Sequence, residues 1–378
     1  MREVTEIGMG RSARRGYDLS EVALVPSRRT RDVDDVSTAW QIDAFGFDIP
    51  LVAHPSDATM SPATVIEVGR LGGLGVLNAE GLWARYDDPL PQLQRIIDAD
   101  PDHPVTPLLQ EIYAEPVKPD LITARITEIS AAGVTTAVRV SPQHTLALAS
   151  TILAAGVDLL VIAGTIVSAE HVSTQDEPLN LKQFIADLDV PVIVGGCANY
   201  QTALHLMRTG AAGVIIGISA DFYSSTDEVL GIRVPLATAI VDAAAARRDY
   251  LDETGGRYVH VIASGEIDNS GLIARALACG ADAVMLGEPL RGVEGAPGQG
   301  SYWDSVAAHP RLPRGSVSEP VPSCGSLEKV LFGPADGWNG RTNLFGAVKR
   351  AMAKTGYKDL KEFQKVELVL SSSARDSD

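Results

Sequence analysis

The sequence contains few cysteines, and their arrangement excludes two kinds of protein. Only three are present among 378 residues, namely Cys197, Cys279 and Cys324, and no two of them form a CxxC pair. An odd number of widely spaced cysteines provides neither a disulfide framework nor the paired ligands of a structural zinc site. We therefore expect a protein of a reducing compartment that binds no metal through cysteine.

Long apolar runs and an excess of positive charge are also lacking. No apolar run reaches 18 residues, and the N-terminal segment MREVTEIGMGRSARRGYD has no apolar stretch of signal-peptide length. The formal net charge of -16 opposes attraction to nucleic acids and to anionic lipids. These absences predict a soluble, cytoplasmic protein that binds neither nucleic acids nor membranes.

What the sequence does contain is a series of short apolar runs separated by segments of helix length. Within each run the residues are apolar in succession, which is typical of strands buried on both faces of a parallel sheet. Eight such strands predict an α/β fold of the (β/α)8 TIM barrel type. The expected strands are Ile49–His54, Gly75–Leu77, Thr135–Val140, Asp158–Gly164, Pro191–Gly196, Gly213–Ile218, Val259–Gly265 and Asp282–Gly287.

Helices are expected between these strands, and several of them end in a glycine that directly precedes the next strand, a common helix C-cap. The expected helices are Pro62–Leu71, Leu121–Ala132, Gln143–Ala155, Leu179–Leu188, Gln201–Thr209, Pro235–Leu251 and Ser270–Ala278. We expect residues 1–370 to form one barrel domain, with an irregular excursion at 78–121 and a loop-rich flap at about 292–343. Residues 371–378 are predicted to be a disordered tail.

The stretch from Val259 to Glu288 is the expected ligand cradle. It contains two consecutive buried strands that end in glycine turns, at Gly265 and Gly287. Such turns expose backbone N–H groups beside a helix N-terminus, an arrangement that holds phosphates in barrels of this kind. Glu266 and Glu288 place carboxylates where an anion is expected, so the stretch combines a phosphate-binding backbone with side chains of the wrong charge.

A resemblance to a known family follows from longer motifs. These are YDLSEVALVPSRRT, IPLVAHPSDAT, GRLGGLGVLN, GIRVPLATAI and VIASGEIDNSGLIARALACGADAVMLGEPL. They resemble the IMP dehydrogenase/GMP reductase family over roughly residues 17–300. The segments ARRGYDLSEVALVPSRRTRDVDDVSTAW and GVTTAVRVSPQ are similar to an actinobacterial branch of that family. The resemblance implies an NAD(P)-dependent purine-nucleotide oxidoreductase that forms homotetramers and lacks the inserted CBS domains.

The resemblance also implies a catalytic cysteine and a neighbouring threonine in the loop 219–230. Aligned without a gap between Gly217 and Gly231, the sequence has Ser224 at the cysteine position and Thr226 at the threonine position. A serine hydroxyl is a far weaker nucleophile than a thiolate unless a base activates it. We therefore expect the covalent reaction of the family to be lost or altered.

The family's nucleotide-binding residues are altered as well. Asp221 and Phe222 replace Gly-Ser, Ser264 replaces the ribose-binding Asp, Glu266 replaces Gly, and Glu288 replaces Ser. Two like charges about 4 Å apart repel by roughly 4 kcal/mol at an effective dielectric near 20. This repulsion exceeds the roughly 1.5–3 kcal/mol of one charged hydrogen bond, so we expect a nucleotide monophosphate to bind poorly.

The residues expected to bind the cofactor also differ from those of the family. The Asp and Asn that follow the fourth and fifth strands in the family fall on Ala163 and Cys197, and the flap segment SYWDSVAAHPRLPRG shows no Arg-Tyr pair. NAD(P) is thus implied by the resemblance alone. The matching residues that we still expect in the barrel mouth are Asp57, Thr226, Gly265 and Gly287.

Several readings of single residues stay open. Cys197 is either a relocated nucleophile or a small buried side chain, and His54 is either a general base or a hydrogen-bonded residue at a strand end. Gly265 and Gly287 either contact a ligand or only permit their turns. The carboxylates either form a divalent-metal site or a solvated acidic rim; they are Asp221, Asp227, Glu228, Glu266 and Glu288.

Three functions are compatible with these residues. The first is the family's oxidoreductase reaction, with its original or with altered chemistry. The second is a non-catalytic relative kept as a binding or regulatory partner, because the barrel is intact while its mouth has changed. The third is a barrel that binds a different ligand, such as a flavin or an unphosphorylated, cationic or metal-bound molecule. We expect the family's original activity to be lost or strongly changed.

Overall fold

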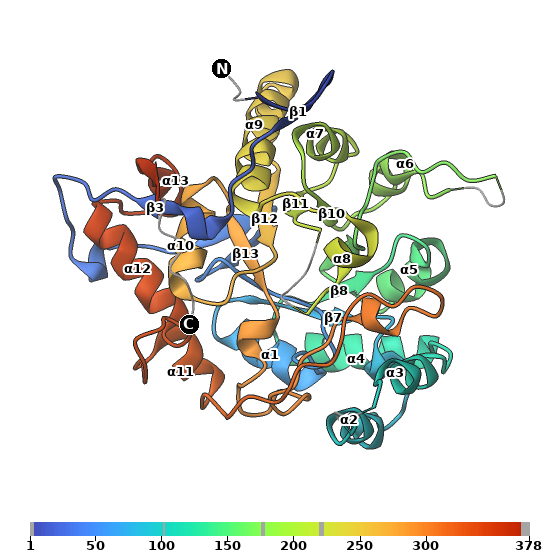
Figure 1. Cartoon of the computed structure of the whole chain (residues 1–378). Coiled ribbons are helices and arrows are strands. Elements are labelled where there is room, and N and C mark those ends of the chain that lie inside the picture. The colour runs from blue at the N-terminus through green and yellow to red at the C-terminus, as the bar shows by residue number, and fades with distance from the viewer. Residues whose placement is uncertain (1–3, 101–102, 175–177, 219–222, 372–378) are drawn as a thin grey trace.

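The computed structural model describes residues 4–100, 103–174, 178–218 and 223–371. Eight parallel strands form a closed barrel in which each strand pairs with its neighbours in the chain, and the last strand pairs with the first. Helices surround the barrel (Figure 1). The predicted TIM barrel is thereby confirmed. The barrel strands are β6 (Leu51–Ala53), β7 (Leu74–Asn78), β8 (Ala137–Val140), β9 (Leu159–Ala163), β10 (Val192–Cys197), β11 (Gly213–Ile216), β12 (His260–Ser264) and β13 (Ala283–Leu286).

The helices that cover the barrel lie close to their predicted positions. α10 begins at Ser270, where the side chain of Asn269 accepts a hydrogen bond from the Leu272 N–H, as expected of an N-cap residue. The apolar residues of these helices face the strands because their spacing places them on one side of the helix. The covering helices are α1 (Pro62–Arg70), α4 (Pro119–Ala131), α5 (Thr145–Ala154), α6 (Leu181–Ala186), α7 (Tyr200–Arg208), α9 (Leu236–Thr254) and α10 (Ser270–Ala278). A further short helix, α8 (Thr226–Leu230), lies in the segment that was expected to be a loop.

The excursion after β7 is more ordered than the sequence analysis predicted. It contains a 3-10 turn, η3 (Leu82–Ala84), and two helices, α2 (Leu90–Ile97) and α3 (Thr106–Tyr113). Apolar residues three apart, such as Leu93 and Ile96, are buried in a second core cluster. Tyr302 and Trp303 of the flap are buried in the same cluster. The excursion therefore forms the support on which the flap rests.

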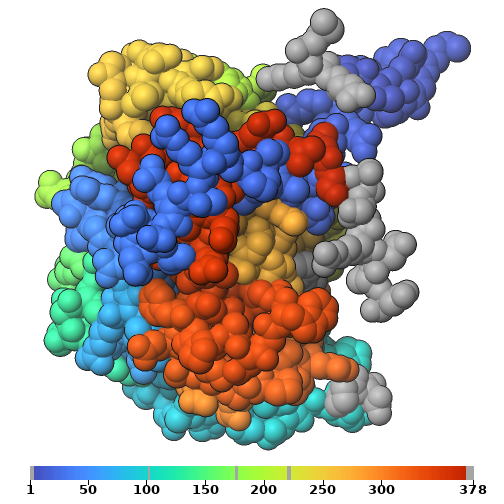
Figure 2. Space-filling model, turned by 90° about the vertical axis from the view of Figure 1, so that its left-hand side faces the viewer, coloured from blue at the N-terminus to red at the C-terminus, as the bar shows by residue number. Residues whose placement is uncertain are grey.

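Most of the helical elements of the flap and of the C-terminal part of the chain are short. They are η4 (Glu288–Leu290), η5 (Ser305–Ala308), α11 (Leu327–Phe332), α12 (Leu344–Thr355) and α13 (Leu360–Phe363). The chain then forms β14 (Leu368–Leu370), which pairs antiparallel with β3 (Val22–Leu24) near the other end of the chain. Figure 2 shows these blue and red segments side by side on the surface. The predicted tail, residues 371–378, lies outside the described residues except for Ser371.

The segment that precedes the barrel forms two hairpins and two 3-10 turns. β1 (Val4–Gly8) pairs with β2 (Arg11–Arg14), and β4 (Trp40–Ile42) pairs with β5 (Phe45–Phe47). The turns are η1 (Leu19–Glu21) and η2 (Val33–Asp35). The second hairpin lies at the N-terminal ends of the barrel strands, because the ring of Trp40 packs 5.9 Å from that of His260, the first residue of β12. The opposite end, where the strands stop, is therefore the open mouth.

Candidate functional site

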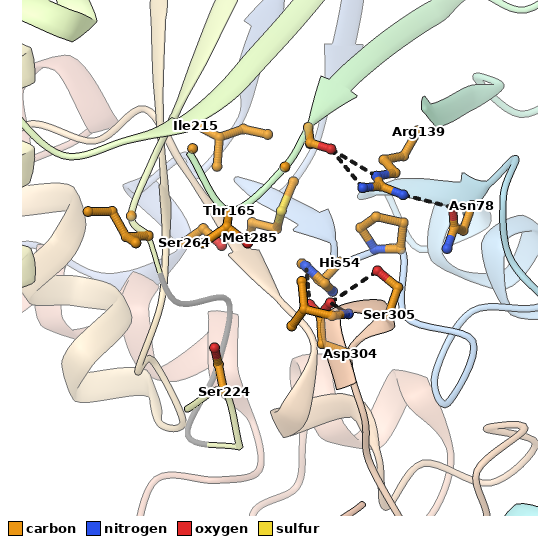
Figure 3. Close-up of a pocket in the computed structure, with 17 residues that line it drawn as sticks. His54, Asn78, Arg139, Thr165, Ile215, Ser224, Ser264, Met285, Asp304 and Ser305 are labelled. Atoms are coloured by element: carbon orange, nitrogen blue, oxygen red, sulfur yellow. Dashed lines mark hydrogen bonds and ion pairs between the residues drawn. The ribbon is translucent and has the colours of Figure 1, made fainter. Parts of the chain in front are cut away.

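A cavity lies at the C-terminal ends of the barrel strands, where ligands bind in this fold (Figure 3). Its volume is about 80 Å³. The polar side chains that surround it come from six strand ends and from the flap: His54, Asn78, Arg139, Thr165, Ser224, Ser264, Asp304 and Ser305. Asn78 and Ser264 are the last residues of β7 and β12, and His54 directly follows β6. We call this space the central cavity.

A second cavity of about 280 Å³ adjoins the central one. The two share Gly217, Ile218, Ser224 and Ser264 in their walls. The second cavity is bounded by the segment Asp18–Ser20, by α8 and by the turn at Gly265 and Glu266. We call it the outer cavity. Together the two spaces lie just above the lower end of the roughly 300–1,000 Å³ that ligand pockets usually occupy.

Ser224 lies between the two cavities and lines both, whereas Thr226, which was expected in the mouth, lines neither. Thr226 is fully buried at the start of α8. The Ser224 Oγ is 3.0 Å from the Thr226 Oγ1, and among the described residues this is its one side-chain hydrogen bond. A threonine hydroxyl is no base at neutral pH, so the contact does not activate Ser224 as a nucleophile.

Cys197 does not take the place of the missing thiolate. It ends β10 and is only 2% exposed. Burial raises the pKa of its thiol to about 12, and burial likewise raises that of Cys279 to about 11. In the described part of the chain, none of the three cysteines lines either cavity. Cys197 is therefore a small buried side chain of the barrel wall.

His54 follows β6 and faces the central cavity, where it adjoins the flap (Figure 3). Its Nε2 lies 3.5 Å from the Asp304 Oδ2, and its Nδ1 lies 3.3 Å from the Tyr302 hydroxyl. Burial lowers the pKa of the imidazole; Asp304 opposes this shift and Arg139 adds to it. The ring is therefore neutral at pH 7 and able to accept a proton or a hydrogen bond.

Arg139 is a site residue that the sequence analysis missed. It comes from β8, and its Nη2 and Nε donate to the carbonyl of Ala163 at 2.7 and 3.1 Å. Its Nη1 lies 3.3 Å from the carboxylate of Glu80. The signal was present in the run Ala-Val-Arg-Val, because an arginine inside a buried apolar strand requires a partner at the strand end. The ion pair leaves little of this positive charge for a ligand.

Glu266 lies in the wall of the outer cavity. Its Oε2 is 3.8 Å from Arg233, which also lies 3.2 Å from Asp18 and 3.6 Å from Asp227. Glu228 contributes a further carboxylate to the wall. Burial raises the pKa of Glu266, while Arg233 opposes this shift. One guanidinium thus serves several carboxylates in the outer cavity. Ser264 and Gly265 line the same space.

Glu288 has a different position from the one expected. It is buried and lines neither cavity; its Oε1 lies 3.1 Å from the Arg291 Nε. Gly287 also lies outside both cavities, and a Cβ there would come within 2.3 Å of the Tyr302 hydroxyl oxygen. Close packing against the flap therefore explains this glycine without a ligand. The two residues connect the flap to the barrel.

Asp57 lies beneath the mouth rather than in it. It is 3% exposed and lines neither cavity. Its Oδ2 accepts a 2.7 Å hydrogen bond from the Tyr113 hydroxyl, which in turn accepts one of 2.9 Å from the Trp303 indole. Burial raises the pKa of Asp57 to about 6. The hydrogen bond from Tyr113 and the charges of Arg85 and Arg139 lower the pKa, but by less. Asp57 thus links the first barrel strand to α3 and to the flap.

The divalent-metal alternative finds no support among the residues that the structure describes, since none of their His, Cys, Asp and Glu side chains form a group of three suited to a metal ion. Asp221 lies outside the described residues. Among the helices of the described chain, none is both long enough and apolar enough to cross a bilayer.

The structure thus shows a (β/α)8 barrel with a two-part, polar cavity at its mouth and a flap packed beside it. The chain belongs to the IMP dehydrogenase/GMP reductase family, because the model of the IMP dehydrogenase / GMP reductase domain matches residues 16–336. This match confirms the resemblance predicted from the sequence motifs.

Individual relatives agree with this assignment. An uncharacterized oxidoreductase of Mycolicibacterium smegmatis is 58% identical over 375 residues, which cover 98% of this chain and 100% of the relative. The inosine-5'-monophosphate dehydrogenase of Aquifex aeolicus is 31% identical over 238 residues, 59% of this chain and 46% of the relative. The crystal structure of an IMP dehydrogenase/GMP reductase-like protein from Corynebacterium glutamicum superposes with a TM-score of 0.93 at 53% identity, covering 97% and 98% of the two chains. The chain is therefore similar along its length to relatives without CBS domains.

Proposed function

We propose that this protein binds a small molecule without a phosphate group at the barrel mouth and does not carry out the thiol-dependent reaction of its family. The observation that carries the proposal is the charge of the outer cavity. Of the residues that the structure describes, four line it with a carboxylate, namely Asp18, Asp227, Glu228 and Glu266, and one, Arg233, with a guanidinium. The ligand is expected to be neutral or cationic, for example a nucleoside rather than a nucleotide.

The argument against a phosphate is electrostatic. Arg233 is already shared by Asp18, Asp227 and Glu266, at 3.2 to 3.8 Å. A phosphate at the Gly217 and Gly265 turns would meet uncompensated negative charge, and even at about 8 Å one unit charge repels another by roughly 2 kcal/mol at an effective dielectric near 20. Glu288 does not add to this repulsion, because Arg291 neutralises it outside the cavities.

The argument against the family's covalent chemistry concerns the nucleophile. Ser224 occupies the position where the family has its cysteine, and its described hydrogen bond leads to Thr226 and not to a base. With the pKa of Cys197 near 12, only about one thiol in 100,000 is ionised at pH 7. The residues of the mouth are thus suited to binding and orienting a ligand, not to forming an adduct with it.

NAD(P) is implied by the family, and the residues of this chain do not fit it. The positions that follow β9 and β10 in the family's cofactor region are Ala163 and Cys197, which offer no polar side chain to a nicotinamide amide. The carbonyl of Ala163 already accepts two hydrogen bonds from Arg139. The central cavity, at about 80 Å³, is also smaller than a ligand pocket for a molecule of this size requires.

The groups that remain available for recognition are hydroxyls and the neutral imidazole of His54. Thr165, Ser264 and Ser224 present hydroxyls around the central cavity, each able to donate or accept a hydrogen bond. His54 presents a ring held between Asp304 and Tyr302. These groups match a ligand with several hydroxyl or amide groups. By family resemblance we also expect the protein to be a homo-oligomer, such as a homotetramer.

Calorimetry with matched ligands tests the proposal. We expect inosine to bind at least tenfold more tightly than IMP, and guanosine at least tenfold more tightly than GMP, because the members of each pair differ by the phosphate alone. Glu266→Gln should recover much of the lost monophosphate affinity. Glu128→Gln, a carboxylate on the outer surface of α4, is the matched control and should change nothing. Micromolar IMP affinity that is unaltered by Glu266→Gln contradicts the proposal.

Turnover assays separate this proposal from the family's oxidoreductase reaction. With IMP or GMP as substrate and NAD+ or NADPH as cofactor, we expect no change in absorbance at the nicotinamide band above that of buffer. Catalysis that disappears in Ser224→Ala or Thr226→Ala would show that the loop still carries out the reaction. A yellow colour of the purified protein would point to a bound flavin, which is the third reading of the mouth.

A further inference from the structure

A third cavity lies at the opposite end of the barrel from the mouth, and we call it the basal cavity. Its volume is about 770 Å³, which is larger than that of the two mouth cavities together and within the usual range of ligand pockets. Three separate parts of the chain enclose it: the hairpin of β4 and β5, the N-terminal ends of β12 and β13, and the start of α13. Neither the family's reaction nor the ligand proposed above involves this space.

The charged groups at the bottom of the basal cavity already have partners. The buried carboxylate of Asp282 accepts hydrogen bonds from the Lys361 Nζ at 2.8 Å and from the Tyr258 hydroxyl at 2.7 Å. Its second oxygen pairs with Arg247 of α9. These contacts attach α13 to the base of the barrel, which is a structural role. They occupy Lys361, the one cation that lines the cavity among the described residues.

The polar groups of the basal cavity that remain without partners are hydrogen-bond acceptors. Asp43 and Asp48 are exposed, and no cation of the described chain pairs with either carboxylate. Gln41 uses its amide N–H on the carbonyl of Asp43, at 2.6 Å, so its side-chain oxygen stays available. A ligand that complements these groups carries N–H donors and no negative charge.

His260 adds a further acceptor. Its Nδ1 is buried and has no hydrogen-bond partner among the described residues. Burial lowers the pKa of the ring to about 4, so the imidazole is neutral at pH 7. The Nδ1 lies 4.0 Å from the Asp282 Oδ2, which favours the tautomer that has its proton on Nδ1. The Nε2 is then free to accept a hydrogen bond.

The floor of the basal cavity is aromatic. The rings of Trp40 and Phe47 stack with centroids 5.2 Å apart, and the edge of the His260 ring lies 5.9 Å from Trp40. Aromatic faces attract cations, and Lys361 shows this here, with its Nζ 3.6 Å from the centroid of the Tyr258 ring. The floor thus favours a flat apolar body, and a positive group on that body is compatible with it.

We propose that the basal cavity is a second small-molecule site, which takes a flat aromatic molecule bearing an amine or amidine group. The aromatic body lies on the floor at Trp40 and Phe47, and the nitrogen donates to the carboxylates of the hairpin. An anionic ligand is disfavoured, because the carboxylates outnumber the cations even when Arg247 is counted with Lys361. These carboxylates belong to Asp43, Asp48, Asp282 and Asp359. The proposal is independent of the ligand at the mouth, since the two sites lie at opposite ends of the barrel.

The first test compares two probes that have the same ring and the same two-carbon linker but opposite charge, tryptamine and indole-3-propionate. Each is titrated into the full chain and followed by saturation-transfer NMR. We expect tryptamine to bind at least tenfold more tightly than indole-3-propionate. In Asp43→Asn/Asp48→Asn this ratio should fall several-fold, because both substitutions remove negative charge from exposed positions and leave the aromatic floor intact. Equal affinities of the wild type for the two probes overturn the proposal.

The second test locates the bound probe by filling the cavity. Gly46 lies in its wall, and a Cβ there would meet no atom within 4 Å, so Gly46→Leu adds a side chain without displacing the backbone. We expect its affinity for tryptamine to fall at least tenfold. Gly8→Leu, at a glycine of β1 that is equally free of contacts, is the matched control and should bind as wild type does.

The acidic outer cavity at the mouth is the other place where a cationic probe can bind. Glu266→Gln distinguishes the two locations, because it alters the outer cavity alone, and it should leave tryptamine affinity unchanged. Affinity that is lost in Glu266→Gln and retained in Gly46→Leu places the probe at the mouth and overturns the proposal. Melting curves of the variants verify that the barrel is folded.

Discussion

Glu288 and Arg291 form a buried ion pair in which the carboxylate Oε1 lies 3.1 Å from the guanidinium Nε. Arg291 also donates to the Tyr223 hydroxyl at 2.8 Å and to the Ser318 hydroxyl at 2.6 Å. The carboxylate that the sequence suggested as an obstacle to a phosphate thus belongs to the connection between the barrel and the flap. The negative charge that does face a ligand is that of the outer cavity, at Glu266.

The two glutamates should therefore respond differently to neutralisation. Glu288→Gln is expected to lower the free energy of unfolding by about 3 kcal/mol, because removing one member of a buried pair leaves the other charge uncompensated. It should leave monophosphate affinity within about twofold of wild type. Glu266→Gln is expected to change stability by less than about 1 kcal/mol, because its pair with Arg233 is half exposed. Urea unfolding and calorimetry on both variants measure this contrast, and equal effects on stability would contradict it.

Gly287 should prove to be a packing residue. A Cβ at this position would lie 2.3 Å from the Tyr302 hydroxyl oxygen and 3.1 Å from the His54 Cβ. Gly287→Ala is expected to lower the free energy of unfolding by about 1–3 kcal/mol, the usual effect of overpacking. Tyr302→Phe in the same chain removes the atom in closest contact, so the double variant should regain part of the loss. A double-mutant cycle from urea unfolding gives the coupling, and strictly additive effects would argue against this contact.

The barrel could be predicted from the sequence because its strands are apolar on successive residues, a pattern that few other folds produce. The mouth was harder to predict, because its contacts join distant parts of the chain. Gly287 and Tyr302 are far apart in the sequence, as are Asp57 and Tyr113, so no local pattern indicates that they are in contact. Other signals were present and were overlooked. Glu288 and Arg291 stand three residues apart, a spacing that allows pairing within one helical turn. Leu93 and Ile96 show the spacing of a helix in the excursion that was expected to be irregular.

The thiols offer a chemical test of the missing nucleophile. Burial raises the pKa of Cys197 to about 12 and that of Cys279 to about 11, so both should react slowly in the folded protein. Cys324 is partly exposed and should react first. With a chromogenic disulfide at pH 7.5, we expect about one thiol per native chain to react within minutes and all three in urea. Mass spectrometry identifies the modified residue, and rapid labelling of Cys197 would reopen its role as a nucleophile.

Asp57 should make stability depend on pH. Its pKa is about 6 in the folded chain, raised mainly by burial, and about 3.9 when unfolded. Between these values the folded state retains a proton that the unfolded state has lost, so stability falls as the pH rises from about 4 to 6 and is level above that range. The difference of about two pKa units corresponds to roughly 3 kcal/mol.

Asp57→Asn isolates this effect, because an amide accepts the Tyr113 hydrogen bond without titrating. The variant's free energy of unfolding, measured in urea at a series of pH values, should be similar to that of wild type near pH 4. It should exceed the wild-type value by up to about 3 kcal/mol at pH 7. Tyr113→Phe is the control for the hydrogen bond itself: it removes the 2.7 Å contact to Asp57 and should raise the pKa of the carboxyl further, shifting the fall in stability to higher pH. A difference between Asp57→Asn and wild type that is independent of pH would mean that Asp57 is ionised in the folded protein throughout this range.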